Sequence, residues 1–204
     1  MKPRLQLATL LAALSLSMAA HAQLITFDDL TKPDGLPAVY EGFEVSWSTL
    51  LSTWDNPAPA TALGSKTLSP GQEQSIELRS FTPFYLDSVH LSTAFFQQFD
   101  PVTSVVLRGY SAGQQVAYAQ FNLDLSNPGT PQFEWYSLDG TPFDHPVDRL
   151  TFSGVSDGSL DTDFYLDGLN VRPVPEPETW ALMGLGAVGV LARRQRPGKK
   201  RATA

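Results

Sequence analysis

The sequence predicts an all-β fold, a two-sheet antiparallel sandwich of the jelly-roll kind, flanked by an N-terminal signal peptide and a single C-terminal hydrophobic helix. Short runs of alternating apolar and polar residues recur through the middle of the chain, as in strands with one buried face. Gly, Pro, Asn, Asp and Ser bound these runs, and no stretch of ten or more residues keeps a helical period between Gln23 and Thr179. A closed barrel is the alternative, whereas the lack of an internal repeat disfavours a propeller or a solenoid.

The first 22 residues predict a signal peptide that is removed on export. Lys2 and Arg4 form a charged start, residues 5–18 are apolar, and Ala20-His21-Ala22 fits the small-x-small pattern of signal peptidase. The apolar run is too short to span a bilayer comfortably. We therefore expect cleavage after Ala22 and begin the fold at Gln23.

The middle segment, residues 23–172, is long enough for one domain with its own hydrophobic core. Residues 111–113, Ser-Ala-Gly, separate two alternating runs and predict a hairpin turn. About nine short strands are expected in such a sandwich, and the alternating runs place them at 24–28, 43–47, 75–79, 84–96 (bent or broken), 103–110, 115–123, 132–136, 148–153 and 163–171.

Charge is distributed unevenly along the chain. The middle segment holds six basic and nineteen acidic residues, so its net charge is near −13, against −7 for the whole chain. Such a surface repels nucleic acid and anionic membranes and attracts divalent cations. Nucleic acid is therefore excluded as a partner. The chain has no cysteine, which excludes disulfides, thiol catalysis and cysteine metal sites.

Residues 51–71 show the least regular pattern of the middle segment and predict a long loop, which in a compact domain is either functional or merely mobile. A sugar site needs an aromatic platform with polar neighbours. Trp54 is the best candidate for ligand binding because it lies in this loop, whereas a strand tryptophan packs more often in the core. The aromatic candidates, each with core or rim packing as its alternative, are Tyr40, Trp47, Trp54, Trp135 and Tyr136.

The C-terminal segment, residues 173–204, combines four features in a fixed order. Pro175-Glu176-Pro177 follows an extended linker, Trp180 opens an apolar run over 179–192, and a basic cluster begins at Arg193 and Arg194. The run has 14 residues, whereas a spanning helix needs about 20. Basic residues beside an apolar segment stay on the cytoplasmic side, so the β domain would face outward. By length alone, a weak membrane anchor and a buried helix remain open.

This order of features resembles the PEP-CTERM sorting signal of Gram-negative bacteria. The resemblance implies that exosortase, a membrane-embedded cysteine transpeptidase, recognises Pro175, Glu176, Pro177, the helix and the arginines. It also implies an inner-membrane precursor, cleavage near the triplet, and release of the domain to the cell surface or the extracellular matrix. The basic end continues to Ala204 and is slightly longer than the usual abrupt arginine stop of the family.

The ends of the middle segment also resemble proteins with this tail, which often begin like residues 25–30 and end like residues 164–171. The sandwich between them is similar to galactose-binding-like and carbohydrate-binding modules. In such sandwiches the first and last strands often pair, which would bring Asp28 and Asp29 near Asp167. The resemblance therefore implies that these three acids hold a structural calcium. The alternative is that these acids are turn formers and strand-edge charges. No cofactor is otherwise required.

Nothing in the sequence predicts an active site. Only His90 and His145 remain after signal removal, which is too few for a zinc trio, and no G-x-S-x-G motif is present. Paired carboxylates are unavoidable by chance among nineteen acids, so they give no evidence of glycoside hydrolysis. We expect a non-catalytic surface or biofilm-matrix protein that associates with exopolysaccharide, as the resemblance implies. A secreted glycan-active enzyme module is the alternative.

Overall fold

The described residues of the computed structural model are 22–30, 37–46, 49–53, 61–70, 75–94, 102–126, 132–156 and 163–174. Within them lie eleven strands and one short 3-10 helix, in the order β1 (Gln23–Thr26), β2 (Val39–Tyr40), β3 (Phe43–Val45), β4 (Leu50–Thr53), β5 (Lys66–Ser69), β6 (Ser75–Thr93), β7 (Ser104–Ser111), β8 (Gln114–Asn122), β9 (Glu134–Ser137), η1 (Pro142–Asp144), β10 (Val147–Val155) and β11 (Phe164–Pro173).

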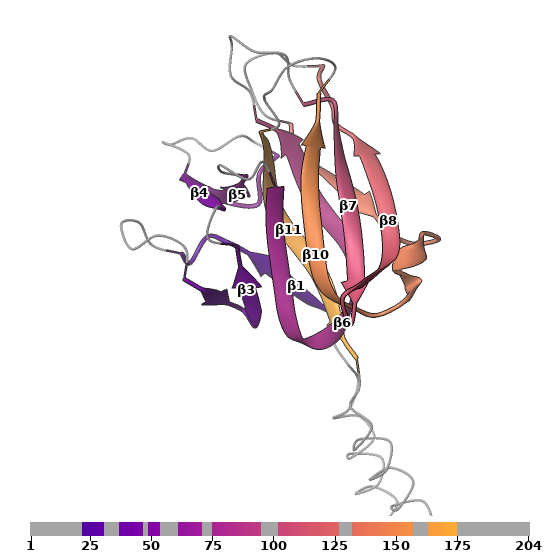
Figure 1. Cartoon of the computed structure of the whole chain (residues 1–204). Coiled ribbons are helices and arrows are strands. Elements are labelled where there is room, and N and C mark those ends of the chain that lie inside the picture. The colour runs from indigo at the N-terminus through magenta and orange to yellow at the C-terminus, as the bar shows by residue number, and fades with distance from the viewer. Residues whose placement is uncertain are drawn as a thin grey trace, which may run out of the picture. The chain divides into compact units, whose positions relative to one another are not determined.

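The strands form two layers, and each pair of hydrogen-bonded strands is antiparallel. One layer runs β2-β3-β6-β10-β7-β8, and Figure 1 shows β10, β7 and β8 side by side in it. The other runs β4-β5-β11-β6-β9, with β1 also pairing with β11. The prediction of an all-β antiparallel sandwich is confirmed.

The long strand β6 belongs to both layers. Its first part pairs with β3 and β10, and its second part pairs with β11 and β9. Phe84 lies at the junction, opposite both Val147 and Pro173. Just before it, Phe81 and Pro83 are exposed, and a proline at this point cannot donate to a ladder. The sequence predicted two separate strands here, whereas the structure has one strand that pairs on both sides of residues 81–83.

Alternating residues of both layers meet in one core. Ile76, Leu150 and Phe152 from the first layer are fully buried with Leu166 and Leu169 from β11. Each fully buried apolar side chain of this size contributes about 1.5–3 kcal/mol. Burial between the layers therefore holds the two halves of β6 together.

The sequence predicts the turn between β7 and β8 correctly but not the connection over residues 51–71. The predicted turn between β7 and β8 is confirmed, since Ala112 and Gly113 both have positive φ, 49° and 81°, as a tight hairpin turn requires. The predicted irregular loop over 51–71 is wrong at both ends, because β4 and β5 pair with each other there. Their runs are short and lack clear alternation, so the sequence gives little sign of them.

Two phenylalanines of this fold make a matched stability test. Phe152 is completely buried in β10, whereas Phe81 is 72% exposed at the bend of β6. We expect Phe152→Ala to lower the free energy of unfolding by about 3–5 kcal/mol, because it leaves a cavity. Phe81→Ala deletes the same atoms at an exposed position, so it should lower the free energy of unfolding by less than about 1 kcal/mol. Chemical denaturation measures both values, and equal losses would contradict the core assignment.

Candidate functional site

The three acids predicted to hold calcium each have a separate partner. Asp28 follows β1, and its Oδ1 accepts hydrogen bonds from the backbone amides of Ser65 at 2.6 Å and Lys66 at 3.2 Å. The contact is so close that a Cβ on Gly64 would lie 1.7 Å from the Asp28 carboxylate. A glycine is therefore required at position 64 to let the segment before β5 reach the end of β1.

Asp29 and Tyr40 form a second contact at this end of β1. The Tyr40 hydroxyl donates to an Asp29 carboxylate oxygen and to the backbone oxygen of Thr26, the latter at 2.5 Å. Burial, and then the hydrogen bond to Asp29, raise the pKa of Tyr40 well above its usual value. Tyr40 therefore stays protonated and keeps Asp29 as its acceptor.

Asp167 is fully buried in β11, against the outer side of its layer. One carboxylate oxygen, Oδ2, accepts the backbone amide of Leu63 at 2.5 Å and lies 3.2 Å from His90 Nδ1. The other, Oδ1, has no hydrogen-bond partner among the described residues. The His90 ring stacks on Trp135 with centroids 4.7 Å apart, so the carboxylate is sealed beneath aromatic side chains.

The expected pairing of the first and last strands is confirmed, with Thr26 opposite Gly168. It does not bring the three carboxylates into one cluster. Nowhere in the described ranges do three or more His, Asp or Glu residues gather as a metal site would require. Calcium binding by Asp28, Asp29 and Asp167 stays a prediction.

The His90–Asp167 pair is the contact that the sequence analysis missed. A histidine oriented by a carboxylate makes two of the three members of a Ser-His-Asp triad, but the His90 side chain is only 3% exposed. A substrate cannot reach it, so the pair is structural. Its one signal in the sequence is an acid inside the apolar strand that ends the domain, which favours a buried, partnered carboxylate.

The aromatic candidates are distributed differently from expectation. Trp135 was expected in the core as a strand residue, but its side chain is 44% exposed on β9. Tyr40 and Tyr136 pack partly buried against the core. Trp47 and Trp54 lie outside the described residues.

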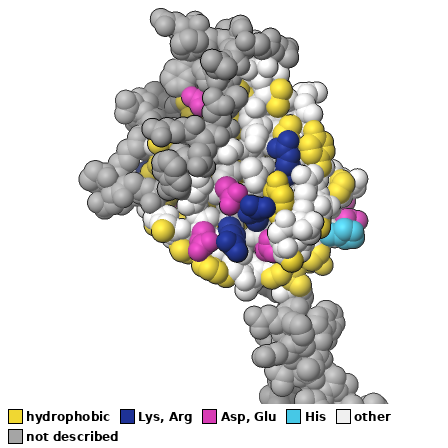
Figure 2. Space-filling model, viewed as in Figure 1, with side chains coloured by type: hydrophobic (Ala, Val, Ile, Leu, Met, Phe, Trp, Pro, Cys, Tyr) yellow, Lys and Arg dark blue, Asp and Glu magenta, His cyan; other side chains and the backbone are white. Residues whose placement is uncertain are grey.

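The outer face of the layer containing β10 gathers three of the five basic residues in the described ranges. Leu78, Leu107 and Leu150 point into the core, so the neighbouring Arg79, Arg108 and Arg149 point outward. Figure 2 shows basic side chains on this side, interspersed with acids. We call this surface the arginine face and define it by Glu77, Arg79, Arg108, Tyr110, Arg149 and Thr151.

Arg79 and Arg149 are direct cross-strand partners on β6 and β10. Like charges placed opposite each other destabilise a sheet. Arg149 offsets this with an ion pair to Glu77 at 3.4 Å and with its guanidinium 4.0 Å from the centre of the Tyr110 ring. Arg79 is exposed and forms no ion pair with any residue in the described ranges.

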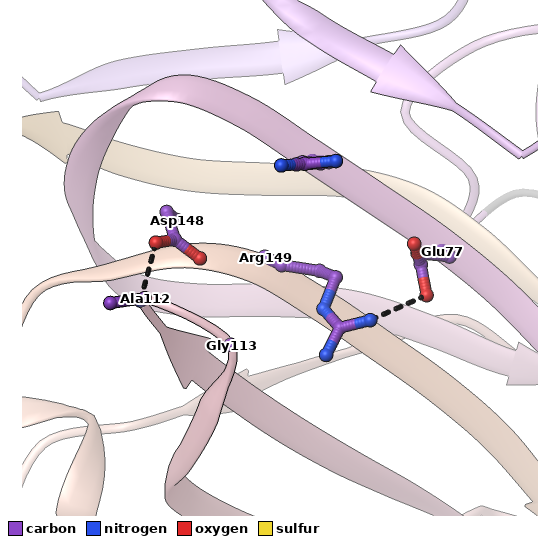
Figure 3. A pocket seen from close by; sticks show the side chains of 6 residues that line it. Glu77, Ala112, Gly113, Asp148 and Arg149 are labelled. Carbon is purple, nitrogen blue, oxygen red and sulfur yellow. Dashed lines mark hydrogen bonds and ion pairs between the residues drawn. The ribbon is translucent and has the colours of Figure 1, made fainter.

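A cavity of about 270 Å³ opens beside these two arginines, at the turn between β7 and β8 (Figure 3). Asp148 Oδ2 accepts the backbone amide of Ala112 at 2.7 Å. This bond holds a turn in which Ala112 has left-handed backbone geometry, which costs a non-glycine residue about 1–2 kcal/mol. This hydrogen bond therefore fixes the rim of the cavity. The residues that line the cavity are Glu77, Arg79, Ala112, Gly113, Asp148 and Arg149.

The C-terminal segment matches a known family model over residues 173–196, described as the PEP-CTERM protein-sorting motif. The chain carries a PEP-CTERM sorting signal. The matched range includes Pro175, Glu176, Pro177, Trp180 and the arginines at 193 and 194, whose individual roles stay predictions. These residues, the apolar run over 179–192 and the signal peptide lie outside the described residues. Within those described, no helix has the length and apolar character to cross a membrane.

Solved structures with similar folds include enzymes and carbohydrate-binding modules. An arabinose-bound α-L-arabinofuranosidase, MgGH51, aligns with a TM-score of 0.45 and 11% identity over 76% of this chain and 26% of its own, so the chain spans about a quarter of that enzyme. The family 32 module of NanJ from C. perfringens, solved with galactose, aligns with a TM-score of 0.36 and 6% identity, over 62% of this chain and 93% of its own. The Stig cyclase Fisc from Fischerella sp. TAU aligns with a TM-score of 0.40 and 16% identity, over 78% of this chain and 91% of its own. No curated protein matches the chain. Likenesses this distant carry no functional argument.

Asp167 offers a test of the buried cluster. Asp167→Ala removes the acceptor for the Leu63 amide and for His90 in a buried site, and each unsatisfied group costs about 1–3 kcal/mol. We expect a loss of about 3 kcal/mol in the free energy of unfolding, measured by denaturant titration. Asp87→Ala is the matched control because Asp87 pairs with Arg172 at a partly exposed site, where such pairs contribute about 0–1 kcal/mol. A loss no larger than that of the control would refute the structural role.

Proposed function

We propose that this protein is an exported, non-catalytic surface or extracellular-matrix protein, sorted by exosortase and associated with exopolysaccharide. The observation that carries the sorting proposal is the PEP-CTERM motif over residues 173–196, which indicates an exported protein processed at the membrane. The motif begins at Pro173, the last residue of β11. Cleavage near the Pro-Glu-Pro triplet would therefore release the β domain with little additional chain.

The sorting signal works through charge and hydrophobicity. Arg193 and Arg194 end the apolar run, and basic residues next to such a run favour the cytoplasmic side. Trp180 suits the opposite interface. In this arrangement signal peptidase removes residues 1–22, the tail holds the precursor in the inner membrane, and exosortase acts on the triplet from outside.

Association with polysaccharide is supported by the properties of the domain. Its net charge near −13 disfavours nucleic acid and anionic lipid as partners. Its exposed surface carries aromatic side chains at Trp135 and Tyr118, and amphipathic aromatics of this kind suit an interface with sugars. The buried His90–Asp167 contact is closed to substrate, so we assign it no catalytic role.

Mass spectrometry of the protein exported by a bacterium with an exosortase tests the sorting proposal. We expect the extracellular form to begin at Gln23 and to lack residues 193–204, because both ends are processing signals. Replacing Arg193 and Arg194 with Ala should leave the tail uncut and the protein in the membrane fraction. Lys199 and Lys200 lie beyond the matched residues, so their replacement with Ala is the matched control. An extracellular form with residues 193–204 intact would contradict sorting.

Retention of the protein on exopolysaccharide purified from the same bacterium tests the binding proposal. We expect Trp54→Ala to weaken retention several-fold, since an aromatic platform contributes about 1 kcal/mol or more. Phe81→Ala removes another aromatic, exposed at the bend of β6, and should leave retention unchanged. Equal retention of both variants and the parent would count against Trp54. Turnover of the polysaccharide, lost when a carboxylate pair is replaced, would overturn the non-catalytic proposal.

A further inference from the structure

We propose that the arginine face binds an acidic glycan, a polysaccharide whose sugars carry carboxylates, and that Arg79 and Arg149 receive one of these carboxylates. The inference rests on the proposed association with polysaccharide and narrows its ligand class. It assigns recognition of the carboxylates to this sheet face and leaves the stacking role predicted for Trp54 unchanged.

The distribution of charge singles out this face. The middle segment carries nineteen acids and six basic residues, so most of its surface repels an anionic chain. Arg79, Arg108 and Arg149 lie on three neighbouring strands that pair in register. At physiological ionic strength the screening length is about 8 Å, so the local field is set by the three arginines together with the neighbouring acids Glu44, Glu77 and Asp148. This face is therefore less negative than the domain as a whole.

The arrangement of Arg79 and Arg149 favours an anion between them. The two are opposed across β6 and β10. Among the described residues only Arg149 forms an ion pair, whereas Arg79 has Glu44 opposite it on β3. A bound carboxylate would relieve the like-charge contact, and the planar guanidinium forks match its two oxygens. Arg149 is already positioned by Glu77 and Tyr110, which lowers the entropy lost on binding.

The cavity beside them favours a sugar over a simple polyanion. Its lining includes the carboxylates of Glu77 and Asp148, which would repel a dense polyanion but accept hydrogen bonds from hydroxyl groups. A uronate-containing chain offers both hydroxyl donors and a carboxylate acceptor. The face continues across four strands to Tyr118, which is 44% exposed. At about 4.8 Å per strand this spans about 14 Å, enough for a chain and not only one group.

Titration calorimetry on the full chain in detergent tests the proposal with three probes: polygalacturonate, neutral dextran and poly-glutamate. We expect polygalacturonate to bind most tightly and to weaken as salt increases. Arg79→Gln should lower its affinity at least tenfold, since a charge-assisted hydrogen bond is lost, and Arg79→Lys should restore only part of it. Arg172→Gln is the matched control, because Arg172 pairs with Asp87 away from this face and its loss changes net charge equally.

The outcomes separate this proposal from the one it rests on. Binding of polygalacturonate that Arg79→Gln leaves unchanged, or that Arg172→Gln weakens equally, would overturn the arginine face and leave polysaccharide association intact. Binding of dextran alone would do the same. Equal or tighter binding of poly-glutamate would show a general anion site and overturn the glycan assignment. Absence of binding to every polysaccharide, the bacterium's own included, would overturn both proposals. Equal circular dichroism spectra and melting temperatures establish that each variant is folded.

Discussion

The continuity of β6 is the constraint on which the rest of the structure depends. A strand that runs from Ser75 to Thr93 and pairs in both layers must bend where it leaves one and enters the other. The bend falls at exposed residues before Phe84, and burial on both sides of it keeps the layers together. β10 and β11, the two strands that pair most extensively with β6, place the arginine face on one layer and the buried Asp167 on the other.

The features that local sequence determines were the ones that could be predicted. Alternation located most strands, and Ser-Ala-Gly located the turn between β7 and β8, because side-chain direction and positive φ depend on a few neighbouring residues. β4 and β5 were missed because two four-residue strands, which pair with each other and share one register pair with β11, are too short to leave a clear alternation. The bent β6 was seen as two segments because exposed residues at the bend interrupt its alternation.

The candidate site depends on contacts between residues distant in sequence, which no local pattern reveals. Asp167 and His90 are separated by 77 positions, and the segment that donates the Leu63 amide lies 104 positions before the acid. The sequence did indicate that acids near both ends of the domain would matter. It predicted that they share an ion, which stays a prediction, and it did not reveal the backbone amides, the tyrosine and the histidine that they contact. An acid satisfied by amides and an acid that holds an ion look the same in a sequence.

The place where β11 ends has a mechanical consequence. Residues 168–171 of β11 are hydrogen-bonded on one side to β1 and on the other to β6, and the sorting motif begins within two residues of the strand's end. Tension carried by the tail therefore enters the domain along the axis of an inner strand. Antiparallel ladder bonds run across the strands, so such a load shears many of them together instead of opening them one by one. If the tail holds the chain at the membrane, as proposed, the domain resists being pulled apart at this attachment.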